Sequence, residues 1–236
     1  MKTASIPEYR VEAILVNPAG SYIPAEFHHY IQSYIYNTSS KAREMHSQPH
    51  CFRGFCFSFL PATRGRRNQS HEVKDENDCY VLRVSSVFPQ ILQDIEDDLW
   101  RNGKITIGET TLCLQQIYRV PFQYSGLYHY YLVNIYEYLD KGKNYARSIL
   151  PSEYQKFKEA IEKATKNRWQ IFTGSEPPEF QITFLSRPLY RGEIYMGKKL
   201  IGCSGKMEIK GDKEFLKFVQ AVGIGSNNAK GFGFIT

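Results

Sequence analysis

The sequence lacks long hydrophobic runs, low-complexity tracts and any excess of glycine or proline. No apolar stretch approaches the roughly 18 residues that a membrane-spanning helix needs. The N-terminal segment MKTASIPEYRVEAILV reaches Pro7 and Glu8 before any continuous apolar stretch, so a secretory signal is not expected. These absences argue against a membrane protein, a collagen-like protein and a disordered chain.

Cysteine and charge are also limited. The five cysteines are odd in number and irregularly spaced, and no two of them form a CxxC pair. We therefore expect reduced thiols, a cytosolic location and no disulfide scaffold. The net charge of +6 is a mild basic excess, which is compatible with a nucleic-acid partner without demonstrating one. With 42% hydrophobic residues in a chain of 236, one large core or two ordinary ones can form.

The first half of the sequence predicts one β-α-β-β-α-β unit. Apolar and polar residues alternate at 9–16, whereas Phe27 and Ile31 begin a run of apolar residues at the spacing of a helix face. The expected elements, in order, are strand 9–16, helix 25–40, strand 53–60, strand 79–84, helix 86–100 with Ser86 as its cap and Gly103 at its end, and a strand or hairpin at 105–120.

The second half repeats this scheme more loosely. Its expected elements are strand 130–138, helix 152–169, strands 180–185, 193–195 and 206–209, a helix capped by Asp212, and strand 231–236. We therefore predict an α+β protein of two tandem ferredoxin-like domains, which are also RRM-like, at residues 1–122 and 123–236.

A glycine-rich segment, GIGSNNAKGFG, occupies residues 223–233. Rossmann and P-loop glycine runs follow a strand and open a helix, whereas this segment follows a helix and leads into a strand, which argues against nucleotide binding of those kinds. Glycines let backbone N–H groups come close to phosphate oxygens, and Lys230 adds a positive charge. A turn in which the glycines merely adopt positive φ explains the segment equally well.

This C-terminal GxG-x5-GxG pattern, placed after a second ferredoxin-like repeat, resembles the RAMP superfamily of CRISPR-associated proteins. Within it, the chain is similar to the endoribonuclease that cuts precursor CRISPR RNA. A second block matches that family independently, through YIQSYIYN at 30–37, Met45-His46 and RGFCFS at 53–58. Residues from about 60 to 200 match only in the order of elements.

The resemblance implies a metal-independent endoribonuclease that needs no cofactor. It would bind CRISPR repeat RNA and cut within each repeat by attack of a 2′-OH, leaving a 2′,3′-cyclic phosphate and a 5′-OH. Tyr36 and His46 would handle the protons and Arg53 the phosphate charge. Tyr36 lies about 180° from Phe27 around its helix, so geometry alone makes it a surface tyrosine. The family commonly has lysine at the position of Arg53, and arginine does not donate a proton.

Other histidines and a metal site compete with this assignment. His28 and His29 are alternative acid/base residues on the same helix as Tyr36. Histidines and thiols close together in the sequence also suggest a zinc cluster, but Pro49 interrupts the helix that would align two of its ligands, so we predict no metal site. The ligands of that disfavoured cluster would be His46, His50, Cys51 and Cys56.

Glycine-loop and basic residues are the predicted RNA contacts. They are Gly223, Gly225, Lys230, Gly231 and Gly233 in the loop, Arg64, Arg66 and Arg67 in a polar loop at 62–78, and Lys198, Lys199 and Lys206 near a predicted hairpin. A solvated loop explains the arginines as well. The cations of helix 152–169, Arg168 included, are interpreted as a solvated helix face.

Two other functions are compatible with parts of the sequence. A non-catalytic RAMP subunit would only hold guide RNA in an effector complex, and it would have no need of the Tyr36–His46 block. A generic two-RRM module would stack bases on Phe55, Phe57 and Phe59, but we expect those rings to pack in the core. Expected partners are precursor CRISPR RNA, other effector-complex subunits and a second copy of the chain, with no membrane.

Overall fold

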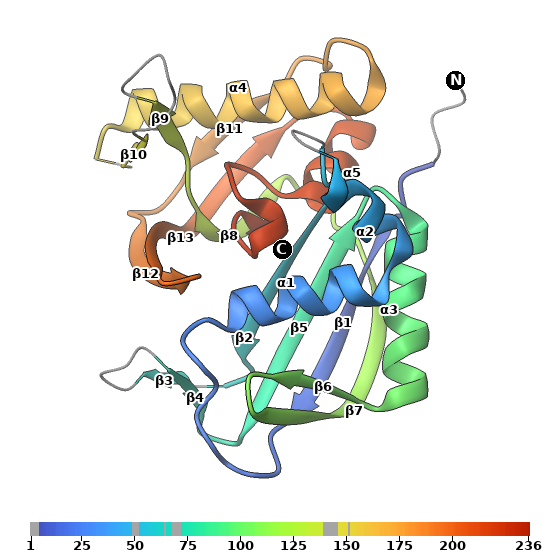
Figure 1. Cartoon of the computed structure of the whole chain (residues 1–236). Coiled ribbons are helices and arrows are strands. Elements are labelled where there is room, and N and C mark those ends of the chain that lie inside the picture. The colour runs from blue at the N-terminus through green and yellow to red at the C-terminus, as the bar shows by residue number, and fades with distance from the viewer. Residues whose placement is uncertain (1–4, 49–51, 64, 68–71, 139–145, 151) are drawn as a thin grey trace.

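The computed structural model describes residues 5–48, 52–63, 65–67, 72–138, 146–150 and 152–236. Two five-stranded antiparallel sheets form the two halves of the molecule, and the C-terminus lies between these halves (Figure 1). No helix in this part of the chain is both long and apolar enough to cross a bilayer.

The first sheet has the strand order β2-β5-β1-β7-β6. Its first four members have the order of a ferredoxin-like unit, and β6 extends the edge as a hairpin with β7. The elements are β1 (Tyr9–Val16), α1 (Phe27–Thr38), α2 (Ser40–Ser47), β2 (Phe55–Pro61), the short hairpin β3 (Gly65–Arg67) and β4 (Val73–Asp75), β5 (Cys79–Ser86), α3 (Pro89–Asn102), β6 (Lys104–Ile107) and β7 (Thr110–Pro121).

The second sheet has the order β11-β13-β8-β14, which is the same ferredoxin-like order, with β12 paired to β13 as an added hairpin. The prediction of two tandem ferredoxin-like domains is therefore confirmed. The elements are β8 (Leu127–Val133), the pair β9 (Tyr136–Tyr138) and β10 (Ala146–Ser148), α4 (Tyr154–Thr173), β11 (Gln181–Phe184), β12 (Leu189–Tyr195), β13 (Lys198–Lys210), α5 (Lys213–Val222), the 3₁₀ turn η1 (Asn228–Lys230) and β14 (Phe234–Ile235).

Strand β2 lies where the two halves meet. Phe55, Phe57 and Phe59 are at most 2% exposed and pack in the first core, so they are not a base-stacking surface. Cys56, on the opposite face of the strand, is also buried, and its thiol lies 3.8 Å from the carbonyl oxygen of Ala221 in α5. Both faces of β2 are covered because the C-terminal half packs against the one that the first core leaves free.

Two predicted boundaries in the first half are wrong. Ser86 belongs to strand β5, and α3 begins with Pro89 in its first turn, where the missing N–H costs nothing. The first helix was expected to run to residue 40; instead α1 ends at Thr38, and Ser39 caps a second helix by accepting a hydrogen bond from the Ala42 backbone N–H. Gly103 ends α3 in the left-handed conformation, as predicted.

Asp212 caps helix α5, because its Oδ1 accepts a hydrogen bond of 2.8 Å from the backbone N–H of Phe215. We expect Asp212→Ala to lower the free energy of unfolding by about 1 kcal/mol, measured by urea denaturation, because the helix loses its cap. Asp212→Asn keeps an oxygen acceptor and is the matched control. Equal losses in the two variants would show that charge, and not the cap hydrogen bond, matters at this position.

Candidate functional site

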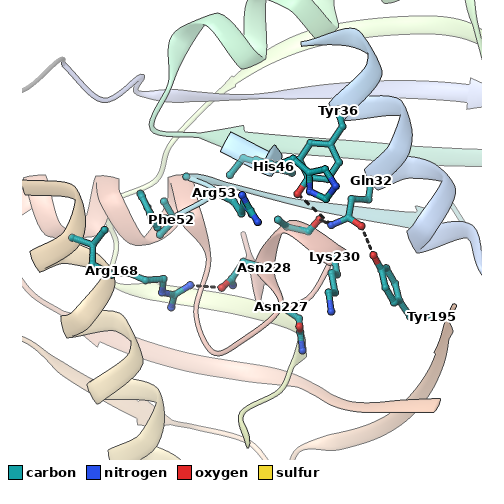
Figure 2. Close-up of a pocket in the computed structure, with 15 residues that line it drawn as sticks. Gln32, Tyr36, His46, Phe52, Arg53, Arg168, Tyr195, Asn227, Asn228 and Lys230 are labelled. Atoms are coloured by element: carbon teal, nitrogen blue, oxygen red, sulfur yellow. Dashed lines mark hydrogen bonds between the residues drawn. The ribbon is translucent and has the colours of Figure 1, made fainter. Parts of the chain in front are cut away.

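A cleft of about 430 Å³ opens where the two halves meet. One wall comes from α1, α2 and the start of β2, and the other from α4, β12 and the glycine-rich segment (Figure 2). The structure brings Tyr36, His46 and Arg53 together in this cleft, as the sequence block predicts they should lie together. The other polar side chains that line it are Gln32, Arg168, Tyr195, Asn227, Asn228 and Lys230.

Tyr36 and His46 come from two consecutive helices. The turn at Ser39 folds α2 back beside α1, so the two rings stack with centroids 4.2 Å apart and planes 24° apart. Tyr36 is only 8% exposed, which corrects the interpretation of a surface tyrosine. The helix face opposite Phe27 is covered by α2 and by Phe55 of β2, whose ring meets Tyr36 edge-on at 5.8 Å. His46 stays exposed at the mouth of the cleft.

The hydroxyl of Tyr36 is oriented by Gln32, one helical turn earlier. The Gln32 Nε2 donates to the backbone carbonyl of Ala229 at 2.8 Å, and the hydroxyl of Tyr195 donates to Gln32 Oε1. Because a carbonyl can only accept, these contacts fix which end of the amide is nitrogen. The same nitrogen lies 3.4 Å from the Tyr36 hydroxyl oxygen, which therefore accepts and keeps its own hydrogen free.

The same wall of the cleft also changes the acidity of Tyr36. Burial raises the pKa of Tyr36 above its ordinary value, and the nearby charge of Arg53 and the hydrogen bond from Gln32 only partly oppose that rise. Tyr36 consequently remains protonated at neutral pH. The site therefore holds a neutral phenol that can donate a hydrogen bond or a proton.

Arg53 stands at the edge of the cleft, just before strand β2. Its side chain is half-buried, and Nη1 donates to the backbone carbonyl of Gln48 at 3.3 Å. Among the described residues no carboxylate pairs with it. The fork of donors is thus available to an anionic group in the cleft.

The two alternative histidines do not line this cleft. His28 is 1% exposed and packs between Phe27 and Phe232, with Nε2 4.0 Å from a carboxylate oxygen of Glu193. His29 is half-buried and lies edge-on to Tyr195, with ring centroids 5.9 Å apart. Of these three histidines, the structure therefore brings only His46 beside Tyr36.

The glycine-rich segment packs closely against its surroundings. A Cβ on Gly231 would lie 2.3 Å from Nδ1 of His28, one on Gly225 2.5 Å from the Asn134 carbonyl oxygen, and one on Gly233 1.8 Å from the Ile224 carbonyl oxygen. All of these glycines, and Gly223, have positive φ and are buried. Several loop N–H groups are already bonded within the protein: Ile224 to Gly233, Ser226 to Asn134 and Gly233 to Tyr131. Packing thus explains the glycines, and polar side chains of the segment face the cleft instead.

Lys230 is the cation that this segment contributes to the cleft. Its Nζ lies 4.9 Å from the centre of the Tyr195 ring, and burial together with the charge of Lys198 lowers its pKa. Lys198, Lys199 and Lys206 are exposed on β13. Arg64 lies outside the described residues, and Arg66 and Arg67 belong to β3.

The zinc hypothesis rests partly on residues that the structure does not describe, because His50 and Cys51 lie outside the described ranges. Within those ranges, no three His, Cys, Asp or Glu side chains are grouped so that they could hold a metal ion. Cys56 is fully buried and its sulfur lies 3.1 Å from the Ser85 hydroxyl.

Arg168 was missed by the sequence interpretation. It was assigned to a solvated helix face, but it lines the cleft from α4 and is half-buried. The signal was present, since Arg168 follows Ile161 by seven residues and so lies within about 20° of it around the helix. Ile161 is fully buried in the second core. A cation on the buried face of an amphipathic helix points to a specific partner.

The cleft is strongly biased toward positive charge. Arg53, Arg168 and Lys230 line it together with His46, and no Asp or Glu is among its described lining residues. Such an arrangement attracts an anion, and phosphate groups are well matched by arginine forks.

The C-terminal part of the chain matches a known protein family. Residues 133–236 match the family model described as "CRISPR associated protein Cas6, C-terminal". Over this part of its length the chain is similar to that family. This match covers the glycine-rich segment and confirms the resemblance to CRISPR-associated proteins that the segment indicated. Comparison with curated protein sequences gives no match.

Solved structures show that the Cas6-like fold extends over nearly the whole chain. One, described as "An RAMP protein binding different RNA substrates", has a TM-score of 0.81 at 18% identity, covering 97% of this chain and 98% of that chain. Another, described as "CRISPR associated protein Cas6", gives 0.78 at 19% identity, with coverage of 97% and 98%. A Cas6-related protein from Pyrococcus furiosus gives 0.79 at 18% identity, with 97% of each chain covered.

Proposed function

We propose that the chain is a metal-independent endoribonuclease that binds CRISPR repeat RNA and cleaves precursor CRISPR RNA within each repeat. The observation that carries this proposal is the meeting of Tyr36, His46 and Arg53 in one positively charged cleft without a described carboxylate. The Cas6 C-terminal match and the RNA-binding RAMP relative support the choice of substrate. Effector-complex subunits and a second copy of the chain stay predicted partners.

The reaction needs three groups. A base removes the proton of the 2′-OH, whose oxygen then attacks the adjacent phosphorus. A cation stabilises the extra negative charge of the phosphorane, and an acid protonates the departing 5′-oxygen. The products are a 2′,3′-cyclic phosphate and a 5′-OH, and the proton balance closes with one proton taken up and one released by the protein.

The contacts of Tyr36 favour its role as the acid. Its oxygen accepts from Gln32, its pKa is raised by burial, and no described side chain of the wall accepts its hydrogen. A phenol in this state gives a proton more readily than it takes one at neutral pH. His46 is exposed beside it, and a neutral imidazole is the usual base near pH 7.

Arg53 binds the phosphate at the cut site in this scheme. Its guanidinium presents two parallel donors to the non-bridging oxygens of the phosphate. A lysine there would offer a point charge, so Arg53 can replace it in binding but not in proton transfer. The three side chains together supply what a metal ion would otherwise provide.

The test uses labelled repeat RNA from the host's own CRISPR array in excess EDTA, beside the same RNA with one 2′-deoxy sugar at the cut site. We expect the first RNA to be cleaved to cyclic-phosphate and 5′-OH ends, and the second to be bound without cleavage. Cleavage that requires Mg²⁺, or that proceeds on the 2′-deoxy RNA, contradicts the proposal. Tight binding of both RNAs without cleavage identifies a guide-RNA subunit instead.

A further inference from the structure

Arg168 is a half-buried cation whose guanidinium is partly enclosed and has no counterion among the described residues. Its Nη2 is closed to solvent and has no hydrogen-bond partner, and no described carboxylate forms an ion pair with it. Removal from water lowers the pKa of Arg168 to about 10. Burying an arginine in this way is costly unless a negatively charged group completes the site. An anionic ligand in the cleft that Arg168 lines would supply such a group.

The glycine-rich segment holds Arg168 in place through Asn228. The Asn228 Nδ2 donates to the carbonyl oxygens of Ile224 at 2.8 Å and Phe232 at 3.1 Å, which turns Oδ1 toward Nη1 of Arg168 (Figure 2). A Cβ on Gly233 or Gly223 would lie 2.6 or 2.8 Å from that same Nδ2. These glycines therefore leave room for the Asn228 amide, and Asn228 orients the guanidinium.

We propose that Arg168, oriented by Asn228, forms a second phosphate subsite on the C-terminal wall of the cleft, which holds an RNA phosphate other than the one that Arg53 contacts. The subsite rests on the proposed RNA substrate, but not on cleavage. It gives the glycine-rich segment a role that does not need its own N–H groups to touch RNA. Asn228 is the positioning residue and Arg168 the binding residue.

The size and layout of the cleft support two phosphates. Arg53 approaches from the first half of the chain, and Arg168 with Asn228 comes from the second half (Figure 2). A volume of about 430 Å³ falls within the range of pockets that hold a ligand of several hundred daltons, so it accommodates a nucleotide and not merely one phosphate. A nucleotide inside it carries one phosphate on each side, and the two arginine sites can take one each.

The first test measures binding of the uncleavable 2′-deoxy repeat RNA to Arg168→Met over a range of salt concentrations. We expect roughly ten- to a hundredfold weaker binding and a salt-dependence slope smaller by about one, as the loss of one phosphate contact predicts. The melting temperature of the free protein should stay the same or rise, because an unpaired buried charge is gone. Lys163→Met removes an exposed charge from the same helix and should change the affinity less than threefold.

The second test identifies the phosphate. Single methylphosphonate groups, which carry no charge, are placed in turn around the cut site. With the neutral group at one position, Arg168→Met should no longer weaken RNA binding appreciably. With the neutral group at a different position, Arg53→Met should no longer weaken it. The subsite is overturned if Arg168→Met weakens RNA binding equally at every methylphosphonate position. It is also overturned if Arg168→Met lowers the melting temperature but leaves the RNA affinity and its salt dependence unchanged, because Arg168 then has a structural role.

The two proposals fail separately. Wild-type protein that binds repeat RNA without cutting it removes the nuclease, while the coupling of Arg168 to one phosphate still establishes the subsite. Cleavage by wild type with no such coupling removes the subsite and leaves the nuclease. Wild-type protein that binds no RNA overturns both.

Discussion

Replacing Tyr36 with phenylalanine is expected to slow cleavage of repeat RNA by roughly a hundred- to ten-thousandfold, with little change in RNA affinity. The substitution removes only the hydroxyl, and an acid positioned on the leaving oxygen typically contributes a factor of this size. The ring that stacks on His46 and packs on Phe55 is kept, so the cleft retains its shape. Single-turnover kinetics with protein in excess measure the cleavage step directly.

A modified substrate separates an acid from a base. If the 5′-bridging oxygen at the cut site is replaced with sulfur, the thiolate departs without protonation, because thiols are far more acidic than alcohols. On this RNA, Tyr36→Phe should come within about tenfold of wild type, whereas His46→Ala should remain at least about a hundredfold slower. The reverse pattern, with His46→Ala rescued and Tyr36→Phe still slow, would exchange the two roles.

Tyr34→Phe is the control for this experiment. Tyr34 lies on the same helix and loses the same atom, but its hydroxyl donates to Asp98 at 2.8 Å, and it does not line the cleft. We expect its cleavage rate to equal that of wild type on both substrates. A comparable rate loss in Tyr34→Phe would mean that the phenylalanine substitutions act through the helix and not through chemistry.

Gly233→Ala is expected to lower the free energy of unfolding by more than about 3 kcal/mol, or to abolish cooperative unfolding altogether. The added Cβ would stand 1.8 Å from the carbonyl oxygen of Ile224 and 2.6 Å from Nδ2 of Asn228. The first of these atoms belongs to the backbone and cannot turn aside as a long side chain does. Gly233 also has a φ of 76°, which an L-residue adopts only with strain. Urea denaturation followed by circular dichroism measures the change.

Gly174→Ala is the matched control for the strain that a positive φ imposes on alanine. Gly174 ends helix α4 with a φ of 72°, and no heavy atom lies within 4 Å of the Cβ that alanine would add. It should cost only the strain of the left-handed conformation, about 1 to 2 kcal/mol. If Gly233→Ala costs no more than Gly174→Ala, the close packing of the glycine-rich segment does not stabilise the protein.

Local sequence patterns predicted most of the helices and strands. The spacing of Phe27, Ile31 and Ile35 predicted α1, and Gly103 and Asp212 marked a helix end and a helix start that the structure has. Where a predicted helix boundary was wrong, another local feature set the boundary. Ser39 restarts the chain as α2 because its side chain caps the next turn, which a pattern of apolar residues does not register.

Burial was harder to predict than secondary structure. Arg168 was assigned to a solvated helix face, but it lines the cleft. Tyr36 was predicted as a site residue from the family resemblance, whereas helix geometry alone favoured an exposed side chain; it is only 8% exposed. The angle of Tyr36 around α1 was correct, but that face is covered by α2 and β2, two elements whose positions the helix itself does not encode. For Arg168 the helical angle already indicated the buried side, through Ile161, and the surrounding Lys and Glu residues obscured it.

The sequence by itself determined the order of the elements, the two ferredoxin-like repeats and the block that holds Tyr36, His46 and Arg53, because these depend on residues close together in the chain. Only the tertiary structure decided what completes the cleft. Gln32 meets Tyr195 and Ala229 across separations of 163 and 197 residues, and Arg168 meets Asn228 across 60. Such contacts arise when the second half covers strand β2, and no local periodicity specifies how two packed sheets lie against each other.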